Sequence, residues 1–317
     1  MDLTKTSAYG GGTWTPRQYD SKDERIWGQT IPFGLDSEYK TLKVATLHLP
    51  QENISNISDA EHFQMLDIPT PYIVQREVED YANLLHRLGV SIMFVGTESG
   101  YFHPNLIFTR DVFAMTPYGV ILGRPATSIR AGEESEVGHA LINEGIPIIY
   151  TMHKTALFEG SDMLWVTPQK VFIGIHRTNE EAFSELAQLL AYQGVEAIPL
   201  HINKPGNQHL LGTCNIVNDH CALVRPAKAP DDLIDELNQL EYTIFEVPED
   251  DEVVHKQAMN VVAYKPGRII MPADCPTMKR LYSTVAFIDD IQTTKISEIR
   301  KMAGGLACMT GPVRREM

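Results

Sequence analysis

The chain of 317 residues contains only four cysteines, and no two of them form a CxxC pair. This spacing fits neither a disulfide framework nor a zinc finger, so we expect reduced thiols and a cytoplasmic protein. No run approaches ~20 apolar residues. The polar N-terminus also lacks the apolar centre of a signal peptide, so we expect neither a transmembrane helix nor export.

Positive charge is scarce as well. Lys and Arg number 27 against 41 Asp and Glu, which gives a formal net charge of −14. A chain of this charge should repel nucleic acid and anionic membranes. We therefore expect no nucleic-acid partner and no membrane partner, while the charge is compatible with a small cationic substrate.

Several common catalytic motifs are missing: there is no P-loop, no GxGxxG after a strand, no HExxH and no GxSxG. P-loop NTP hydrolysis, dinucleotide binding and the common serine hydrolase mechanism therefore lose support. A metal site is a minority interpretation of the cluster formed by His209, Cys214, His220 and Cys221. Successive residues on a strand point to opposite faces, so His220 and Cys221 would not readily bind one ion.

What the sequence does contain is a weak internal repeat of about 50 residues. Three helical patterns each end at a glycine that is followed by a short apolar strand, and glycine is favoured just past a helix. In the third pattern, Thr178 and Glu181 are predicted to form a capping box. A degenerate fourth copy at 231–240 lacks the glycine. The three helical patterns cover 74–88, 133–143 and 179–192.

Each repeat also carries a predicted β-hairpin before its helix, recognised by turn-forming residues between two β-rich runs. A first strand at 43–49 and the last segment at 304–313 are expected to close a further unit. We expect the copies to pack into one radial or stacked α/β array over 41–317, with 1–40 as an N-terminal extension or lid. The alternative is an ordinary α/β domain. The predicted hairpins pair 106–109 with 120–122, 163–166 with 171–175, 214–217 with 221–224, and 261–264 with 269–271.

Polar residues with catalytic chemistry lie next to these strands. Asp111 follows an apolar run, Glu159 and His209 precede two of the hairpins, and Cys308 lies in the glycine-rich last segment. Equivalent edges of a radial array converge on its axis, so these side chains could share one pocket. Carboxylates can hold a planar guanidinium, a thiolate can attack its carbon, and a histidine can move protons. Taken singly, each acid could be a cap or turn residue and the histidine a structural one.

At these residues the sequence resembles the guanidino-group-modifying superfamily of arginine deiminases, dimethylarginine dimethylaminohydrolases and amidinotransferases. Segments 105–111 (NLIFTRD) and 304–316 (GGLACMTGPVRRE) look most like arginine deiminase, whereas 123–130 (GRPATSIR) and 176–179 (HRTN) look like the dimethylarginine hydrolase. The resemblance covers roughly 43–316. It implies a five-bladed pseudo-symmetric α/β propeller, the pentein fold, with the active site on its axis.

The resemblance also implies roles for single residues. Cys308 would be the nucleophile and His209 the general acid and base, while Asp111 and Glu159 would grip the guanidinium. Attack by Cys308 would release an amine and leave a thiouronium-type intermediate for water to hydrolyse, with no metal and no organic cofactor. A homodimer would be compatible with such a family. The predicted substrate-binding residues are Asn105, Arg130, Asp162 and Arg177.

Three functions remain open at this point. The first is a hydrolase that converts arginine or an N-substituted arginine to citrulline, and the second is an amidinotransferase that uses the same residues. Leu211 stands where arginine deiminases and amidinotransferases carry an acid, a pattern closer to the dimethylarginine hydrolases. The third is a propeller that only binds a ligand, although binding alone needs no nucleophile.

Overall fold

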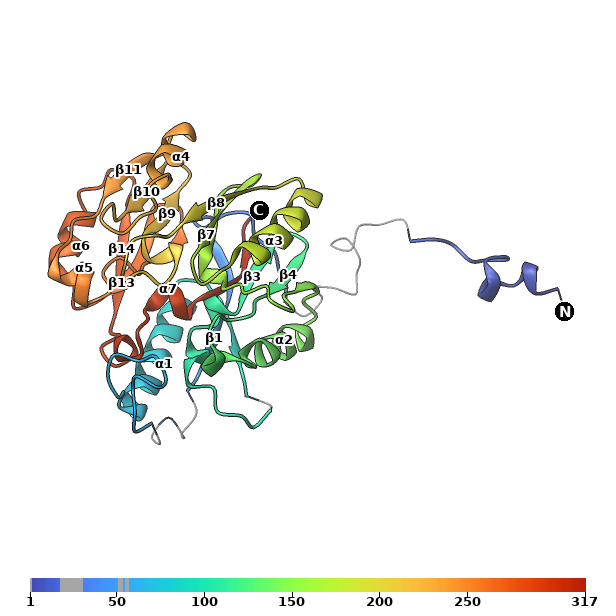
Figure 1. Cartoon of the computed structure of the whole chain (residues 1–317), viewed down its shortest axis with the longest axis horizontal. Coiled ribbons are helices and arrows are strands. Elements are labelled where there is room, and N and C mark those ends of the chain that lie inside the picture. Colours follow the sequence, from blue (N-terminus) through green and yellow to red (C-terminus); the bar gives the residue numbers. More distant parts are fainter. Residues whose placement is uncertain (1, 18–30, 51–53, 55–56, 98) are drawn as a thin grey trace.

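The computed structural model describes residues 2–17, 31–50, 54, 57–97 and 99–317. These ranges form five three-stranded sheets of the same pattern (Figure 1). In each sheet, the middle strand is antiparallel to one neighbour and parallel to the other. The sheets are β15 (Gly311–Arg315), β1 (Leu42–His48), β2 (Ser91–Val95); β3 (Phe113–Thr116), β4 (Gly119–Leu122), β5 (Ile148–Thr151); β6 (Met163–Thr167), β7 (Lys170–Ile175), β8 (Glu196–His201); β9 (Cys214–Asn218), β10 (Cys221–Val224), β11 (Thr243–Glu246); and β12 (Val262–Lys265), β13 (Arg268–Pro272), β14 (Asp290–Thr294).

A helix connects the middle strand of each sheet to its parallel neighbour, as a parallel pair requires. These helices are α1 (Pro71–Arg87), α2 (Glu133–Asn143), α3 (Glu180–Tyr192), α4 (Leu233–Gln239) and α6 (Pro276–Tyr282), and two short helices, α5 (Asp251–His255) and α7 (Leu306–Met309), precede β12 and β15. The 3-10 turns are η1 (Leu3–Lys5), η2 (Ser7–Tyr9), η5 (Pro104–Ile107), η6 (Thr109–Asp111), η7 (Ser128–Arg130), η8 (Gly160–Asp162), η9 (Leu210–Gly212) and η10 (Ile299–Met302). The predicted repeat of hairpin, helix and strand is therefore confirmed.

The two ends of the described body share one sheet. β15 lies antiparallel to β1, with Leu42 opposite Arg315 and Thr46 opposite Gly311. The prediction that the first strand and the last segment close a further unit is confirmed, although only the end of that segment is a strand.

The ends of the helices follow local chemistry. Gly89, Gly145 and Gly194 have φ of 86°, 75° and 76°, as predicted for residues just past a helix C-terminus. Glu241 takes this left-handed conformation after α4 with φ 60°, at a cost of roughly 1 kcal/mol for a residue with a Cβ.

The predicted capping box at the start of α3 is wrong. Asn179 is the N-cap, and its Oδ1 accepts the backbone N–H of Ala182 at 3.0 Å. The hydroxyl of Thr178 instead donates to Asp162 at 2.7 Å. The side chain of Thr178 is therefore bonded to Asp162 and does not cap the first turn of the helix.

The first predicted hairpin is also corrected. Residues 106–109 are not a strand: they run from the end of the 3-10 turn η5 through Phe108 to the start of η6, and the strand begins at Phe113. Pro104 has no N–H and a fixed φ suited to the start of a helical turn. Leu106 and Ile107 are fully buried, and an apolar run buried on all sides does not distinguish strand from helix. The other three predicted hairpins are confirmed.

Part of the predicted extension packs into the body. Phe33 and Leu35 are buried in an apolar cluster, and Glu38 accepts two hydrogen bonds from Nη2 of Arg110 at 3.0 and 3.1 Å. Residues 2–17 contain no buried side chain, and 18–30 lie outside the described residues. The lid role remains a prediction. Across the described ranges, no helix combines the length and apolar character needed to span a bilayer.

Candidate active site

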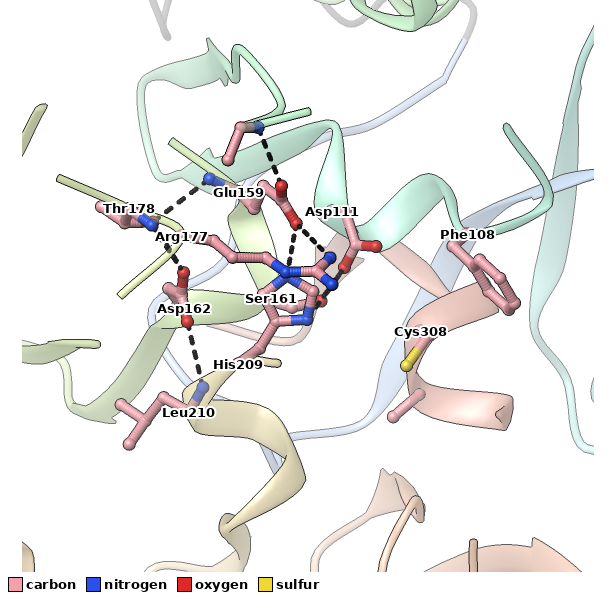
Figure 2. A network of polar contacts seen from close by, with 12 residues as sticks. Phe108, Asp111, Glu159, Ser161, Asp162, Arg177, Thr178, His209, Leu210 and Cys308 are labelled. Carbon is pink, nitrogen blue, oxygen red and sulfur yellow. Dashed lines mark hydrogen bonds and ion pairs between the residues drawn. The ribbon is translucent and has the colours of Figure 1, made fainter. Parts of the chain in front are cut away.

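The predicted catalytic residues lie on turns that immediately precede the first strand of a sheet, which we call the leading turns. Asp111 ends η6 before β3, Glu159 begins the turn η8 before β6, and His209 begins the turn η9 before β9. Cys308 lies in α7 before β15. Local backbone hydrogen bonds close these turns, for example from Asp162 N–H to the Glu159 carbonyl at 2.9 Å. The structure brings the four side chains into one cluster (Figure 2).

His209 lies between two carboxylates. Its Nε2 bonds Oε2 of Glu159, and its Nδ1 lies 3.8 Å from Oδ1 of Asp111. All three side chains are buried. Burial opposes the charged imidazolium, but Asp111 and Glu159 outweigh it and raise the pKa of His209 to about 9. The ring is therefore an imidazolium near neutral pH, a form that can donate a proton to a leaving group.

Glu159 is completely buried and surrounded by donors. Its Oε1 accepts the N–H of Ala126 at 2.9 Å, and Nη1 of Arg177 lies 3.5 Å from its Oε2. Burial would raise the pKa of Glu159, but the charges of His209, Arg130 and Arg177 outweigh that effect and hold it well below its usual range. Glu159 is thus a fixed anion in the cluster.

Cys308 is partly exposed, unlike the other three cysteines, which are buried. Figure 2 shows its sulfur directed toward the side of the cluster that carries His209 and Asp111. Burial and the Asp111 carboxylate raise the pKa of Cys308 to about 11. The substrate-free state therefore holds a protonated thiol at neutral pH, and an incoming cation would favour the thiolate.

A polar cleft lies beside the cluster. Asn105 is a lining residue whose Nδ2 donates to the carbonyl of Phe63 at 2.9 Å. Arg177, with 22% of its side chain exposed, is more accessible than Arg130, with 4%. The residues lining the cleft are Gln64, Asn105, Phe108, Asp111, Arg130, Arg177, Gln208, Met302 and Ala303.

Arg130 is more enclosed than the predicted contact with a substrate carboxylate suggests. Its Nη1 donates to Asp111 at 2.6 Å, and its Nε and Nη2 donate to Glu133 at 3.0 and 2.8 Å. Its Nη2 also approaches the carbonyls of Asn105 and Phe108 at 3.4 and 3.3 Å. Arg130 therefore fixes Asp111 in this structure, and binding a substrate carboxylate would require one of these contacts to open.

Asp162 lies behind the cluster and is not among the cleft residues. One of its oxygens accepts the Thr178 hydroxyl at 2.7 Å and the other accepts the N–H of Leu210 at 3.0 Å (Figure 2). Burial raises the pKa of Asp162 to about 6. Because Leu210 follows His209, Asp162 holds the backbone next to the histidine, and its predicted contact with substrate remains a prediction.

One group of residues in the described chain has the composition of a metal site. The ligand atoms of Asp111, Glu159 and His209 all lie within 4.8 Å of one another. However, Arg130 and Arg177 lie against the same carboxylates, and the imidazole is protonated at neutral pH. These positive charges disfavour a metal ion, and the carboxylates are better matched to a guanidinium.

A family model described as "N,N dimethylarginine dimethylhydrolase, eukaryotic" matches residues 63–315. The chain belongs to this family. The match places it within the predicted guanidino-group-modifying superfamily. A Bacillus subtilis (strain 168) protein, the uncharacterized protein YkgA, is 26% identical over 288 residues, which cover 88% of this chain and 94% of that protein. An arginine deiminase from Borrelia recurrentis (strain A1) is 31% identical over 98 residues, which cover 29% of this chain and 24% of that enzyme.

Solved structures share the fold of this dimethylarginine dimethylhydrolase family member. DDAH from Pseudomonas aeruginosa, a cysteine-to-serine mutant in complex with citrulline, superposes with a TM-score of 0.69 at 20% identity and covers 85% of this chain and 98% of its own. Inosamine-phosphate amidinotransferase from Streptomyces griseus superposes with a TM-score of 0.70 at 15% identity, covering 90% and 97%. The mixed α/β fold of five small sheets is thus shared by hydrolases and transferases.

The leading turn of β12 carries a residue that the sequence analysis did not identify. Asn260 lies two residues before the start of β12, and its Nδ2 lies 3.1 Å from Sγ of Cys308. Its position before a predicted hairpin, equivalent to those of Glu159 and His209, was the signal that could have identified it. In this family member, all five leading turns therefore contribute to one cluster.

Proposed function

We propose that the chain is a cysteine-dependent hydrolase that cleaves a C–N bond in the guanidino group of arginine or an N-substituted arginine. The observation that carries this proposal is the cluster in which Cys308 faces an imidazolium, His209, held between Asp111 and Glu159. The family match supports it. We further propose that the five sheets form the five blades of an α/β propeller around this cluster.

In the first half of the reaction, the thiol of Cys308 releases its proton to solvent as the cation binds, and Sγ then attacks the guanidinium carbon. The cationic substrate favours this ionisation because its charge offsets the burial that raises the pKa of the thiol. His209 then donates a proton to the leaving nitrogen, the C–N bond breaks, and ammonia or an alkylamine departs. The product bound to the enzyme is a thiouronium with a new C–S bond.

In the second half, His209 is neutral and can accept a proton from water. The resulting hydroxide attacks the thiouronium carbon, the C–S bond breaks, and citrulline leaves. Glu159 favours the imidazolium through its bond to Nε2, which helps His209 to accept that proton. As the C–S bond breaks, the hydroxyl proton of the adduct passes to the departing thiolate and the citrulline carbonyl forms. The cycle thus returns a thiol and an imidazolium, and the proton first released to solvent is balanced by protonation of the released ammonia or amine.

We propose that Arg177 contacts the α-carboxylate of the substrate, because its guanidinium lines the cleft and is partly exposed. Asn105 lines the same cleft. Arg130 would join the carboxylate contact only after releasing Asp111 or Glu133, and in the resting state it orients Asp111 toward the reacting group.

The test is mass spectrometry of the purified protein incubated with a panel of guanidino compounds. The panel contains arginine, mono- and dimethylarginine, agmatine and guanidino acids, each with and without glycine or lysine as an acceptor. Citrulline without an acceptor is the expected product. Turnover of agmatine but not arginine would contradict the carboxylate contact, and no turnover of any compound would contradict the proposed function.

An amidinotransferase is the second candidate, because the structure of an amidinotransferase covers 90% of this chain with a TM-score of 0.70. Both reactions pass through a cysteine adduct and differ in whether water or an amine attacks it. Ornithine together with an amidinated acceptor would identify the transferase. Citrulline in the presence of excess acceptor would exclude it.

Cys308→Ala separates catalysis from binding. We expect complete loss of product and of the covalent adduct with the fold retained, because the change removes one sulfur from a partly exposed side chain. Cys275→Ala is the matched control, since Cys275 is buried and reduced but lies outside the cluster. Its turnover should remain while thermal stability falls slightly. An active Cys308→Ala protein would refute the mechanism.

A further inference from the structure

The nucleophile has a polar neighbour from an element that contributes none of the predicted catalytic residues. Asn260 lies on the leading turn of β12, and its Nδ2 donates to Sγ of Cys308 at 3.1 Å. Its Oδ1 accepts the backbone N–H of Ala307 at 2.6 Å. The side chain thus bridges the nucleophile and the residue before it.

The orientation of this amide follows from its partners. The Ala307 N–H can only donate, so the atom facing it must be the carbonyl oxygen of Asn260. The amino group is thereby turned toward the sulfur and offers it a proton. A donor in this position favours a thiolate over a thiol, because a hydrogen bond to the charged form stabilises that form.

The residues around Asn260 hold its contact with Cys308 in place. Asn260 is only 5% exposed, and its backbone N–H donates to the carbonyl of Gln257 at 2.8 Å. A Cβ on Gly305 would lie 2.7 Å from Cγ of Asn260. Only glycine at that position permits so close an approach between the leading turn of β12 and the segment that carries Cys308.

We propose that Asn260 is a further catalytic residue, which holds Sγ of Cys308 for attack and stabilises its thiolate through the Nδ2–H···S hydrogen bond. This inference rests on the proposed function for its use in turnover, but not for its effect on the thiol itself. Burial and Asp111 raise the pKa of Cys308 to about 11, and the Asn260 contact acts in the opposite direction.

The discriminating variant is Asn260→Asp. The carboxylate keeps the shape of the amide and can still accept the N–H of Ala307, but it presents an oxygen in place of a donor to the sulfur. The variant therefore replaces stabilisation of the thiolate by repulsion. Asn260→Ala removes the donor without adding a charge, so its effect should have the same direction and be smaller.

The measurement is the rate at which iodoacetamide alkylates Cys308 in the substrate-free protein between pH 7 and pH 10, followed by peptide mass spectrometry. We expect Asn260→Asp to slow alkylation at a fixed pH by more than tenfold, equivalent to an upward pKa shift of more than about one unit. Asn215→Ala is the matched control. It removes a buried amide that contacts the carbonyls of Leu211 and Met259 rather than the sulfur, and should leave the alkylation profile unchanged.

An unchanged or faster alkylation rate in Asn260→Asp would overturn the inference. If that variant does not fold, Gly305→Ala tests the same contact from the other side. Its Cβ must displace the Asn260 amide, so we expect the same slowing, and an unchanged rate would again refute the role.

Turnover provides a second readout. Once a guanidino substrate is known, Asn260→Asp should lower kcat with little change in KM, because the amide contacts the nucleophile and does not line the cleft. Failure of the whole panel together with slowed alkylation would refute the proposed function but not this inference. Turnover of the panel with unchanged alkylation would refute this inference alone.

Discussion

Replacing Glu159 with glutamine removes the anion that bonds Nε2 of His209 while keeping the shape of the side chain. The pKa of His209 is raised from an ordinary 6.5 to about 9. A shift of this size corresponds to about 3 kcal/mol of preference for the imidazolium. Asp111, whose Oδ1 lies 3.8 Å from Nδ1 of His209, also contributes to this rise in the pKa. We therefore expect Glu159→Gln to lower the pKa of His209 by more than about one unit.

This pKa shift also determines how the free energy of unfolding changes with pH. The pKa of His209 is higher in the folded protein than in the unfolded chain, so protonation of His209 stabilises the folded state. This contribution is fully present below pH 6.5 and is lost as the pH rises through about 9. The free energy of unfolding of the wild-type protein should therefore fall over this window. In Glu159→Gln the fall should be smaller and should end at a lower pH.

The assay is NMR titration of the His209 ring in 15N-histidine-labelled protein, combined with urea unfolding at several pH values. Glu185→Gln is the matched control, because it removes a carboxylate that lies 3.9 Å from the ring of exposed His153. The control should leave the titration of His209 as in the wild type. A wild-type His209 that titrates near pH 6.5, or one that Glu159→Gln does not shift, would refute the reasoning.

Two further predictions concern the leading turns and their supports. Gly160→Ala should destabilise the fold by about 3 kcal/mol, because its Cβ would meet the carbonyl oxygen of Phe113 at 2.0 Å, whereas Gly212→Ala has open space and should leave the melting temperature nearly unchanged. Equal melting temperatures of the two variants would contradict this. Arg130→Gln should cost about 3–5 kcal/mol in urea unfolding, because it leaves the buried Glu133 without its ion pair. Adding Glu133→Gln should recover part of that loss, and a double variant less stable than Arg130→Gln would show that the pair is not the cause.

The sequence predicted the repeated architecture because each unit carries several agreeing signals. In the unit that contains the third helical pattern, the runs 163–166 and 171–175 are separated by turn formers and followed by a helix with one apolar face. Local and tertiary preferences coincide there, and the strands are found where expected. At 106–109 the signal was hydrophobicity alone, and complete burial removes the periodicity that separates strand from helical turn.

The sequence predicted which residues lie in the site better than it predicted what each of them contacts. Glu159 and Asp162 are acids on one short turn, three residues apart, and composition does not say which one bonds the imidazole of His209. The 3-10 geometry directs Glu159 toward His209, and Asp162 toward the N–H of Leu210. Similarly, several acids follow Arg130 closely in the sequence, and only the folded chain shows that Glu133 and the more distant Asp111 enclose it. Asn260 was missed because an asparagine before a strand is also an ordinary turn residue.

The clustering of such groups explains why the site depends on the whole chain. Each leading turn supplies one or two side chains, and no turn can bury its charge alone. Glu159 and Asp111 are stabilised by His209 and Arg130, which come from other parts of the chain. An unpaired buried charge is strongly unfavourable, so these charged groups stabilise one another, and the pairing of β15 with β1 places the segment that carries Cys308 next to them. The groups that orient one another for chemistry are then already fixed before substrate arrives, which is the arrangement that lowers the barrier to a reaction between charged groups.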